Sequence, residues 1–314
     1  MTWQNDSVEL KAPKTILTLV GPTGVGKTEV AVELAQRYNL EVISADSRQI
    51  YKYLDIGTAK PSAELQQKVN FHMIDLVKPN ELYSAADFVR DVTKVIENLN
   101  EQRKKFILVG GSGLYLKALF QPFFKAPKPD LELRAELQKR PLNELYEQLK
   151  KIDIESAQKI HANDRQRIIR ALEIYFLTGR TKTEMIKRSP TETKYYPFYI
   201  GLFIPKNLLY ERIEKRFDMM IEQGLVEEVK HLIDMGYDEN LYAFNAIGYR
   251  EIFDYVKNRI SLELAIKVAK KKSKNYAKRQ FTWFKHQAGV IWIENKDKED
   301  VIRKIVELFP AIAK

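Results

Sequence analysis

Short, continuous apolar runs alternate with amphipathic stretches over the first 120 residues of the chain. Four of these runs predict buried strands, at residues 15–20, 41–45, 71–75 and 106–111. Between them, apolar positions such as Val30, Leu34 and Tyr38 recur at helical spacing, and residues 84–100 begin with the pattern of a capped helix. This alternation predicts the α/β class, with a parallel sheet flanked by helices on both faces.

The pattern changes where three prolines lie within eight residues, at Pro122, Pro127 and Pro129. Such a cluster is typical of a domain boundary. Residues 131–188 show only helical periodicity, and strand-like runs return at residues 198–204 and 290–293. We therefore expect an α/β core, residues 1–125 and 194–314, which is interrupted by a small all-helical insertion domain, residues 126–193.

Composition excludes several kinds of chemistry. The 314 residues include no cysteine, which excludes disulfides, thiolate metal centres and a cysteine nucleophile, and favours the cytoplasm. No apolar run is long enough to span a membrane, and the N-terminus lacks the apolar segment of a signal peptide. The net charge of +10 suits a polyanionic partner, but a merely basic soluble protein has the same balance.

Residues 21–28, GPTGVGKT, match the phosphate-binding pattern G-x-x-x-x-G-K-[ST]. A predicted strand precedes the match and a predicted helix follows it, which is the context that this loop requires. Gly21 and Gly26 allow successive backbone N–H groups to point at phosphate oxygens, Lys27 adds a positive charge, and the Thr28 hydroxyl can ligate Mg²⁺. The loop does not say whether it holds ATP, GTP or the diphosphate of another group.

The next predicted strand ends at Asp46, which places a carboxylate at the sheet edge where ligands of α/β proteins bind. Beside a phosphate loop, this carboxylate can hold Mg²⁺ or accept a proton from a nucleophile, and it can also simply cap a helix. Ser47, Arg48 and Gln49 follow it, and a glutamine amide can bind adenine through two hydrogen bonds.

Seven motifs occur in order along the chain: GPTGVGKT, ADSRQIYKYLDIGTAKP, LVGGSGLYLKAL, NDRQRIIRALEI, RIEKRFDMM, NAIGYREI and KRQFTWFK. Together they resemble the bacterial tRNA dimethylallyltransferase family, also called tRNA isopentenyltransferases. The resemblance runs from the phosphate loop to about His286, and it implies a P-loop NTPase-like core with a helical insertion.

The resemblance implies transfer of a dimethylallyl group from its diphosphate to the exocyclic amine (N6) of the adenosine that is 3′-adjacent to the anticodon in tRNA. Asp46 would be the general base, Thr23 would lie near the bridging oxygen, and Arg216 would grip the diphosphate. The phosphate loop would then bind an allyl diphosphate instead of a nucleoside triphosphate, with Mg²⁺ as cofactor on Thr28. The diphosphate-binding residues would be Gly21, Thr23, Gly24, Val25, Gly26, Lys27 and Thr28.

The resemblance also implies a set of tRNA contacts, with the helical insertion clamping the anticodon stem-loop. Ser112 stands where many family members have threonine, which keeps the hydroxyl. The implied contacts are Asp46, Ser47, Arg48, Gln49, Ser112, Gln166, Arg167, Ile168, Ile169 and Arg170.

The excess positive charge is concentrated near the C-terminus. Residues 261–286 hold eight basic side chains and one acidic side chain on one predicted helix, a net charge of +7. A helix of this kind suits an RNA backbone, so we assign Lys278 and Arg279 to tRNA binding as well. Trp283 and Phe284 lie in the same stretch, where aromatic side chains either stack on bases or pack in a core.

Three other functions fit parts of this pattern. A related enzyme that prenylates free adenine nucleotides would need neither the basic helix nor the insertion. A small-molecule kinase with Asp46 as base, or an RNA-binding NTPase that modifies nothing, would release phosphate steadily from ATP or GTP. Transfer of label from an allyl diphosphate into tRNA, without such release, identifies the transferase, which we expect to be a monomer.

Overall fold

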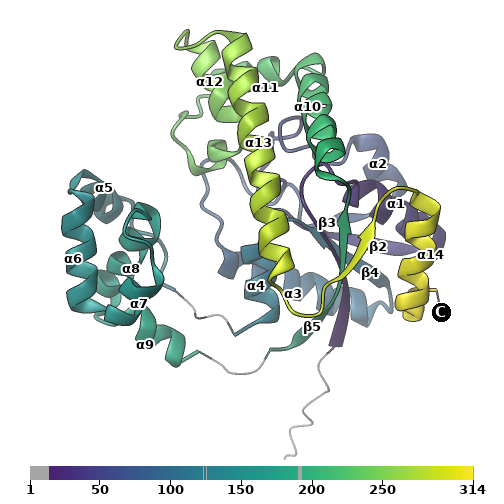
Figure 1. Ribbon diagram of the computed structural model, residues 1–314, viewed down its shortest axis with the longest axis horizontal. Coiled ribbons are helices and arrows are strands. Elements are labelled where there is room, and N and C mark those ends of the chain that lie inside the picture. Colours follow the sequence, from purple (N-terminus) through teal and green to yellow (C-terminus); the bar gives the residue numbers. More distant parts are fainter. Residues whose placement is uncertain (1–13, 123, 125, 190–192, 314) are drawn as a thin grey trace, which may run out of the picture. The chain divides into compact units, whose positions relative to one another are not determined.

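The computed structural model describes residues 14–122, 124, 126–189 and 193–313 (Figure 1). It divides into two compact units, one formed by residues up to Phe120 and from Lys194 onward, and the other by residues 121–193. The second unit is the helical insertion. It begins five residues before the expected start at residue 126, next to the first of the three boundary prolines.

The described residues of the α/β unit form one sheet of six parallel strands in the order β3-β2-β4-β1-β5-β6. The strands are β1 (Lys14–Val20), β2 (Leu40–Ala45), β3 (Phe71–His72), β4 (Lys105–Gly110), β5 (Tyr195–Phe203) and β6 (Ile291–Glu294). The predicted strand at 71–75 is therefore too long. It ends at His72 because Met73 and Asp75 adopt positive φ angles of 64° and 54°, which an extended strand does not allow.

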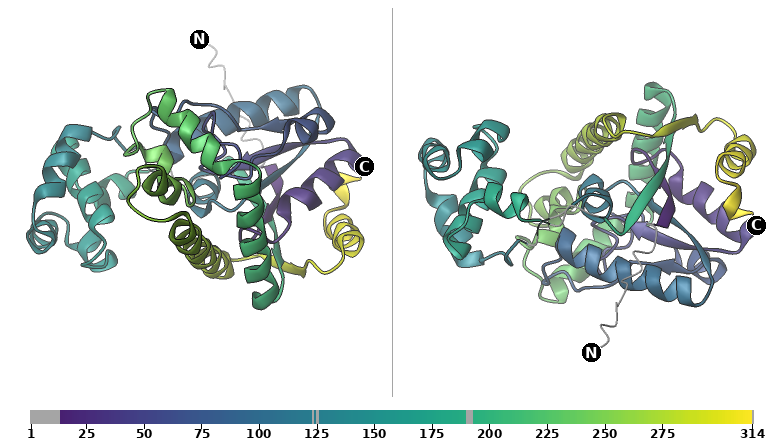
Figure 2. Two further views of the ribbon diagram at one scale, coloured as in Figure 1. Left: turned by 90° about the horizontal axis from the view of Figure 1, so that it is seen from above. Right: turned by 90° about the horizontal axis from the view of Figure 1, so that it is seen from below.

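Helices cover both faces of this sheet, as the α/β pattern predicts. On one face pack α1 (Lys27–Tyr38), α10 (Lys206–Glu222) and α14 (Lys298–Leu308), and on the other pack α3 (Ala85–Glu101) and α4 (Gly113–Phe120) (Figure 2). Because both faces are covered, residues 16–20 of β1 and the whole of β2 are continuous buried runs. The predicted capping box of α3 is confirmed at Ser84 and Asp87.

The remaining elements of the α/β unit are α2 (Ala63–Lys68), α11 (Leu225–Asp234), η1 (Tyr242–Asn245), α12 (Tyr249–Val256), α13 (Leu262–Lys285) and η2 (Pro310–Ile312). The last of these lies where strands begin, since Lys105 at the start of β4 donates to the Ile312 carbonyl. The long helix α13 is the predicted basic helix, and it packs against α10 and α12. Within the residues that the structure describes, no helix is both long and apolar enough to cross a membrane.

In the helical unit, the described residues form five helices around a core of their own. They are α5 (Leu131–Lys139), α6 (Leu142–Ile152), α7 (Ile154–Lys159), α8 (Arg165–Thr178) and α9 (Lys182–Lys187). Glu173 of α8 is fully buried in it and accepts hydrogen bonds from Arg134, Arg170 and the backbone N–H of Asp130. A buried carboxylate is tolerated only when its oxygens are satisfied in this way.

Candidate active site

A cavity of about 1180 Å³ opens where β1, β2 and β4 end. This is the sheet edge at which α/β proteins bind ligands, because the loops that follow parallel strands converge there. Its walls come from the phosphate loop, the segment after β2, the end of β4, α10, α13 and the residues after β6. The sequence therefore placed the phosphate loop and Asp46 in the same cavity correctly.

The phosphate loop curls between β1 and α1 through three glycines with positive φ, Gly21 (144°), Gly24 (81°) and Gly26 (94°). A side chain at Gly21 would put its Cβ 2.6 Å from the carbonyl oxygen of Leu202, so the loop also packs directly on β5. Asn295, just after β6, donates from Nδ2 to the Val25 carbonyl at 2.7 Å. The loop is thus held from both sides before any ligand binds.

Lys27 begins α1 and points back across the loop. Its Nζ donates to the carbonyl oxygens of Gly21 and Pro22 at 2.9 and 2.8 Å. Burial, with a smaller contribution from the charge of Arg216, lowers the pKa of Lys27 to about 8, although the charges of Asp46 and Glu29 oppose the shift. Part of this ammonium is therefore uncharged above pH 8 in the free protein, and an anion in the cavity would restore the charge.

Arg216 reaches the same cavity from α10, as expected. Burial lowers the pKa of its guanidinium, and Glu29 and Asp46 counteract that shift. In the part of the chain that the structure describes, no hydrogen bond or ion pair of Arg216 is recorded. Two partly desolvated cations therefore face one cavity with two carboxylates nearby, which is an arrangement that an added anion stabilises.

Asp46 divides its two oxygens between structure and the cavity. Oδ1 accepts the backbone N–H of Arg48 at 2.8 Å and that of Gln49 at 3.4 Å. Residues 47–50 form a turn and not a helix, so this oxygen caps a turn instead of the helix that the capping alternative expected. Among the described residues, Oδ2 has no recorded hydrogen bond, and Asp46 lines the cavity. Its charge helps to raise the pKa of the neighbouring Tyr276 to about 12, although burial is the larger cause.

Ser47 and Ser112 connect the loops that follow β2 and β4. The Ser112 hydroxyl accepts the backbone N–H of Ser47 at 3.0 Å, and its own backbone N–H donates to the Ala45 carbonyl at 3.3 Å. Ser112 is buried, so its hydroxyl serves this connection. Neither serine lines the cavity.

Arg48 and Gln49, which were expected to contact the target base, are engaged within the protein. Arg48 donates to the Tyr242 carbonyl at 3.0 Å and lies over the Tyr242 ring, away from the cavity lining. Gln49 lines the cavity, but its Oε1 accepts from Ser44 and its Nε2 donates to the carbonyls of Thr58 and Ala59. Both hydrogens of Nε2 are used in this way, so the donor bond that this amide was expected to make to adenine would require one of its two bonds to Thr58 and Ala59 to break.

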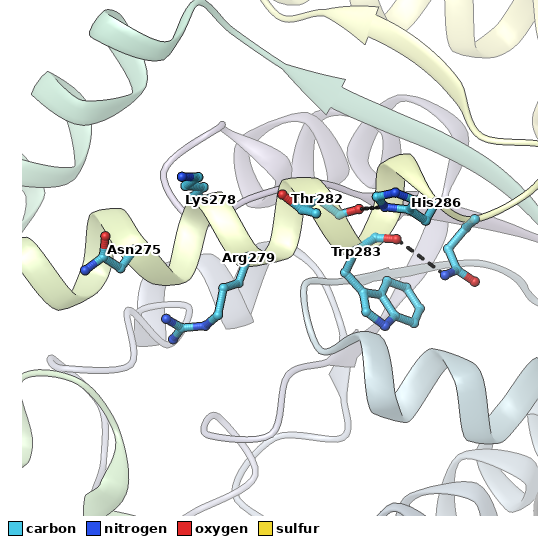
Figure 3. Close-up of a pocket in the computed structure, with 7 residues that line it drawn as sticks. Asn275, Lys278, Arg279, Thr282, Trp283 and His286 are labelled. Carbon is cyan, nitrogen blue, oxygen red and sulfur yellow. Dashed lines mark hydrogen bonds between the residues drawn. The ribbon is translucent and has the colours of Figure 1, made fainter. Parts of the chain in front are cut away.

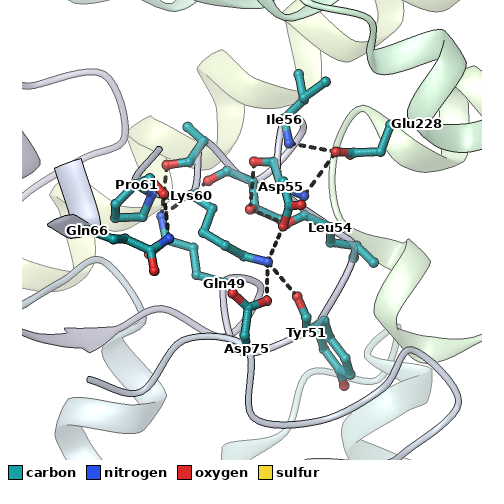
Figure 4. Close-up of polar contacts among 12 residues, drawn as sticks. Gln49, Tyr51, Leu54, Asp55, Ile56, Lys60, Pro61, Gln66, Asp75 and Glu228 are labelled. Atoms are coloured by element: carbon teal, nitrogen blue, oxygen red, sulfur yellow. Dashed lines mark hydrogen bonds and ion pairs between the residues drawn. The ribbon is translucent and has the colours of Figure 1, made fainter. Parts of the chain in front are cut away.

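A buried lysine organises the wall opposite the phosphate loop (Figure 4). The Lys60 side chain is 3% exposed, and its Nζ contacts the Tyr51 carbonyl at 2.9 Å, Asp75 at 2.6 Å and Asp55. On the other side of this segment, Glu228 of α11 accepts the backbone N–H groups of Asp55 and Ile56. The lysine lies in the DIGTAKP stretch, but nothing in that pattern indicates that it would be buried.

The metal ligand expected at Thr28 lies on the cavity, together with the carboxylates of Glu29 and Asp46. Across the described ranges there is no group of three or more His, Asp or Glu side chains arranged to enclose a metal. Mg²⁺ commonly keeps several waters and binds through one or two protein oxygens plus substrate phosphates. The Thr28 hydroxyl and the nearby carboxylates of Glu29 and Asp46 are suitable ligands for a magnesium ion bound in this way.

Lys278 and Arg279 are both exposed on α13, where they line a groove of about 600 Å³ (Figure 3). The groove runs along one side of the helix from Asn275 to Gln287 and includes the half-buried Trp283. Its neighbour Phe284 is fully buried, so the two aromatics differ: one packs in the core and only the other borders the groove.

Part of the positive charge on α13 is neutralised within the protein. Three of its eight basic side chains form ion pairs with carboxylates of α10 and α12: Lys270 with Asp218, Lys272 with Glu251 and Lys274 with Glu214. The net charge of +7 counted along this segment therefore overstates what the helix offers to a polyanion.

The five residues 166–170 do not share one environment. Gln166 and Arg167 are exposed on α8, and Arg167 keeps only a surface ion pair with Asp164 at 3.3 Å. Ile168 and Ile169 lie in the core of the helical unit, at 0% and 6% exposure, so the expectation that their side chains contact tRNA is wrong. Helical geometry explains this, since consecutive positions point to different sides of α8.

Arg170 also serves the helical unit. Its guanidinium pairs with the buried Glu173 and donates to the Pro127 carbonyl at 2.7 Å. Removing it would leave a buried carboxylate with fewer partners.

Sequence reasoning missed residues whose role depends on distant contacts. Gln280 of α13 bridges Thr23 and Gly111, Asn295 holds Val25, and Lys60 holds the segment after β2. A buried glutamine in a basic helix has no local signature. Only the KRQFTWFK stretch, noted for its resemblance, pointed to the region of Gln280.

Comparisons with known proteins identify the family of this chain. The IPP transferase family model matches residues 49–287, which begins just after the phosphate loop and Asp46. The tRNA dimethylallyltransferase of Anoxybacillus flavithermus is 43% identical over 295 residues, covering 93% of this chain and 94% of the relative.

Two solved structures have a similar fold. The tRNA isopentenylpyrophosphate transferase of Bacillus halodurans superposes with a TM-score of 0.69 at 39% identity, covering 96% of this chain and 97% of the other. A eukaryotic dimethylallyltransferase described as acting on tRNA has a TM-score of 0.76 at 28% identity, covering 91% of this chain and 75% of the other. This chain belongs to the IPP transferase family of tRNA dimethylallyltransferases.

Proposed function

We propose that this protein transfers a dimethylallyl group from dimethylallyl diphosphate to N6 of the adenosine 3′-adjacent to the anticodon in tRNA. One observation carries the assignment of roles: Lys27, Arg216 and Asp46 line the same cavity at the end of the sheet. Two cations suit a diphosphate leaving group, and a carboxylate with one open oxygen suits the proton of an aromatic amine.

The reaction breaks the C1–O bond of the allyl diphosphate and forms a bond between C1 and N6. The diphosphate leaves with the electron pair of the broken bond, and Lys27 and Arg216 stabilise its charge. The Oδ2 atom of Asp46 accepts the N6 proton, while Oδ1 keeps the carboxylate aligned through the N–H of Arg48. Thr23 lines the cavity in the phosphate loop, where its hydroxyl would assist at the bridging oxygen. Alignment and charge stabilisation supply most of the catalysis for so reactive an allyl group.

Mg²⁺ fits as the cofactor, with Thr28 as its hydroxyl ligand and Glu29 or Asp46 close by. When bound with substrate, it would supply further positive charge to the leaving diphosphate.

The RNA contacts that the structure supports are those with exposed side chains. On the α/β unit these are Lys278 and Arg279 of α13, and on the helical unit they are Gln166 and Arg167 of α8. Ser47, Arg48, Gln49, Ser112 and Arg170 contribute by holding loops and helices in place. RNA recognition by this protein therefore depends on a few exposed side chains, which the residues packed beneath them hold in place.

The direct test is mass spectrometry of nucleosides from an anticodon stem-loop RNA after incubation with dimethylallyl diphosphate and Mg²⁺. We expect one dimethylallyl group on a single adenosine. Transfer to free adenine nucleotides but not to RNA would support the nucleotide prenyltransferase instead, and steady phosphate release from ATP would support a kinase or NTPase.

Asp46→Asn tests the proposed base within the same assay. Transfer should fall by more than about 100-fold, because the amide cannot take the N6 proton, while RNA affinity stays within about twofold. Asp234→Asn, at an exposed position of α11, is the matched control and should leave transfer unchanged. Normal turnover of the Asp46→Asn variant would show that Asp46 is not the general base.

A further inference from the structure

One side chain of α13 connects the two backbone loops that flank the cavity. Gln280 is 6% exposed, and its Oε1 accepts the backbone N–H of Thr23 in the phosphate loop at 2.8 Å. Its Nε2 donates to the Gly111 carbonyl, just after β4, at 3.0 Å. A single buried amide therefore satisfies one donor and one acceptor from two different strand ends.

The end of β4 is shaped to receive this helix. A Cβ atom at Gly111 would lie 2.2 Å from Nε2 of Gln280, and a Cβ at Gly113 would lie 2.6 Å from the Trp283 ring. A side chain at Gly111 would displace the Gln280 amide, and one at Gly113 would displace the Trp283 ring. Close approach of α13, and not backbone freedom, is thus the reason for these two glycines, since neither has a positive φ.

The contact has a consequence for the phosphate loop. Backbone N–H groups of such loops usually point at the bound phosphate. The N–H of Thr23 is instead held by Gln280, so this peptide does not turn toward the anion, and its direction sets where Thr23 stands on the cavity wall. Gln280 itself lines the cavity at that point.

We propose that Gln280 is a positioning residue for the transfer, which fixes Thr23 and the Gly111 loop relative to each other. The inference rests on the proposed function and adds a residue on α13 to it. Because Lys278 and Arg279 lie two and one residues before Gln280, the helix that meets RNA also sets the geometry of the phosphate loop. Misplacement of a reacting group by about 1 Å can cost about 100-fold in rate.

A double-mutant cycle tests the proposal, with Gln280→Met, Thr23→Ala and the double variant. Gln280→Met should lower kcat by about 10- to 100-fold and change the KM for RNA by less than about threefold. In the Thr23→Ala background the same substitution should cost less than about threefold, because its effect acts through Thr23. An equal loss in both backgrounds is what a purely structural glutamine would give, and that result would overturn the proposal.

Two further measurements keep the test decisive. Gln280→Glu keeps the acceptor for Thr23 and should retain more activity than Gln280→Met, so it replaces the methionine variant if that one fails to fold. Binding of inorganic pyrophosphate, measured by calorimetry without RNA, should weaken about tenfold in Gln280→Met and stay unchanged in Gln102→Met, a control at the exposed end of α3. Unaltered pyrophosphate affinity in Gln280→Met would count against the role of Gln280. Absence of transfer to RNA by the wild type would count only against the proposed function, because the pyrophosphate measurement does not depend on RNA.

Discussion

The phosphate loop, residues 21–28, and the segment after β2, residues 46–60, line the same cavity but are stabilised in opposite ways. In the phosphate loop, every positive φ falls on a glycine, which adopts it without steric cost. In the segment after β2, Tyr53 and Ala59 take positive φ angles of 68° and 47°, and the adjoining Met73 and Asp75 do the same. Such residues cost about 1 to 2 kcal/mol each in this conformation.

Tertiary contacts offset the strain in the segment after β2. Lys60 joins Tyr51, Asp55 and Asp75, and the Gln49 amide donates to the carbonyls of Thr58 and Ala59. Strained backbone persists where surrounding contacts determine it fully, and such places are often functional. The conformation of the phosphate loop is therefore set by its own glycines, whereas that of the segment after β2 depends on contacts with residues distant in the sequence.

The largest effect should come from Gly21→Ala, which removes a glycine that the conformation of the phosphate loop requires. The new Cβ would lie 2.6 Å from a backbone oxygen of β5 that cannot move aside, so turnover should fall by more than about 100-fold. Gly236→Ala is the control, because that glycine has a φ of 82° but nothing within 4 Å of its Cβ position. Equal losses in turnover from the two variants would show that φ alone matters and not the contact with β5.

A smaller effect is expected from Lys60→Met, which removes the buried ammonium that holds the segment after β2. Turnover should fall by about 10- to 30-fold as Gln49 and Asp46 lose their fixed positions. The free energy of unfolding should fall by only about 1 to 3 kcal/mol, because Asp55 and Asp75 are 59% and 41% exposed and regain water.

Hydrogen exchange locates the effect of this substitution. Protection should fall in residues 46–60 and 73–77 and remain in α1. Asp75→Asn, which keeps an oxygen for Lys60, should show a milder form of the same pattern. Loss of protection throughout the α/β unit would mean that Lys60 supports the whole fold instead of this segment.

The smallest effect concerns pH and the charge of Lys27. Because burial lowers the pKa of Lys27 to about 8, pyrophosphate affinity of the wild type should fall by about fivefold between pH 7 and pH 9. In Lys27→Arg the charge persists over this range, and the ligand's own titration is common to both proteins. Parallel pH profiles would contradict the lowered pKa.

Folding stability gives an independent check with a defined sign. The pKa of Lys27 is about 8 in the folded protein against an ordinary 10.5, so between these values the unfolded chain binds more protons. Wild-type stability should therefore rise with pH between 8 and 10.5 relative to Lys27→Met. A constant difference across that window would show that Lys27 is not desolvated.

Sequence reasoning predicted most of the fold because its signals are local. The apolar runs and their spacing predicted six strands and the helical insertion, and the phosphate loop was recognised from eight consecutive residues. It failed at residues 73–75, where four contacts to the segment after β2 override a strand-like pattern: Asp75 N–H to Gln49, Leu76 and Val77 N–H to Ile50, and Asp75 to Lys60. It also failed at Ile168 and Ile169, because a motif carries no information on which residues of a helix face the core.

By itself, the sequence determined the class of sheet, the phosphate loop with Lys27, and a carboxylate at Asp46 beside it, since each depends on neighbouring residues and on the geometry of parallel strands. Tertiary structure alone decided which polar side chains remain available to a ligand. Gln49, Arg48 and Arg170 use their hydrogen bonds inside the protein, while Gln280 and Lys60 build the cavity from positions far along the chain. The reason is physical: a buried polar group must find a partner, and that partner is set by packing and not by distance along the sequence.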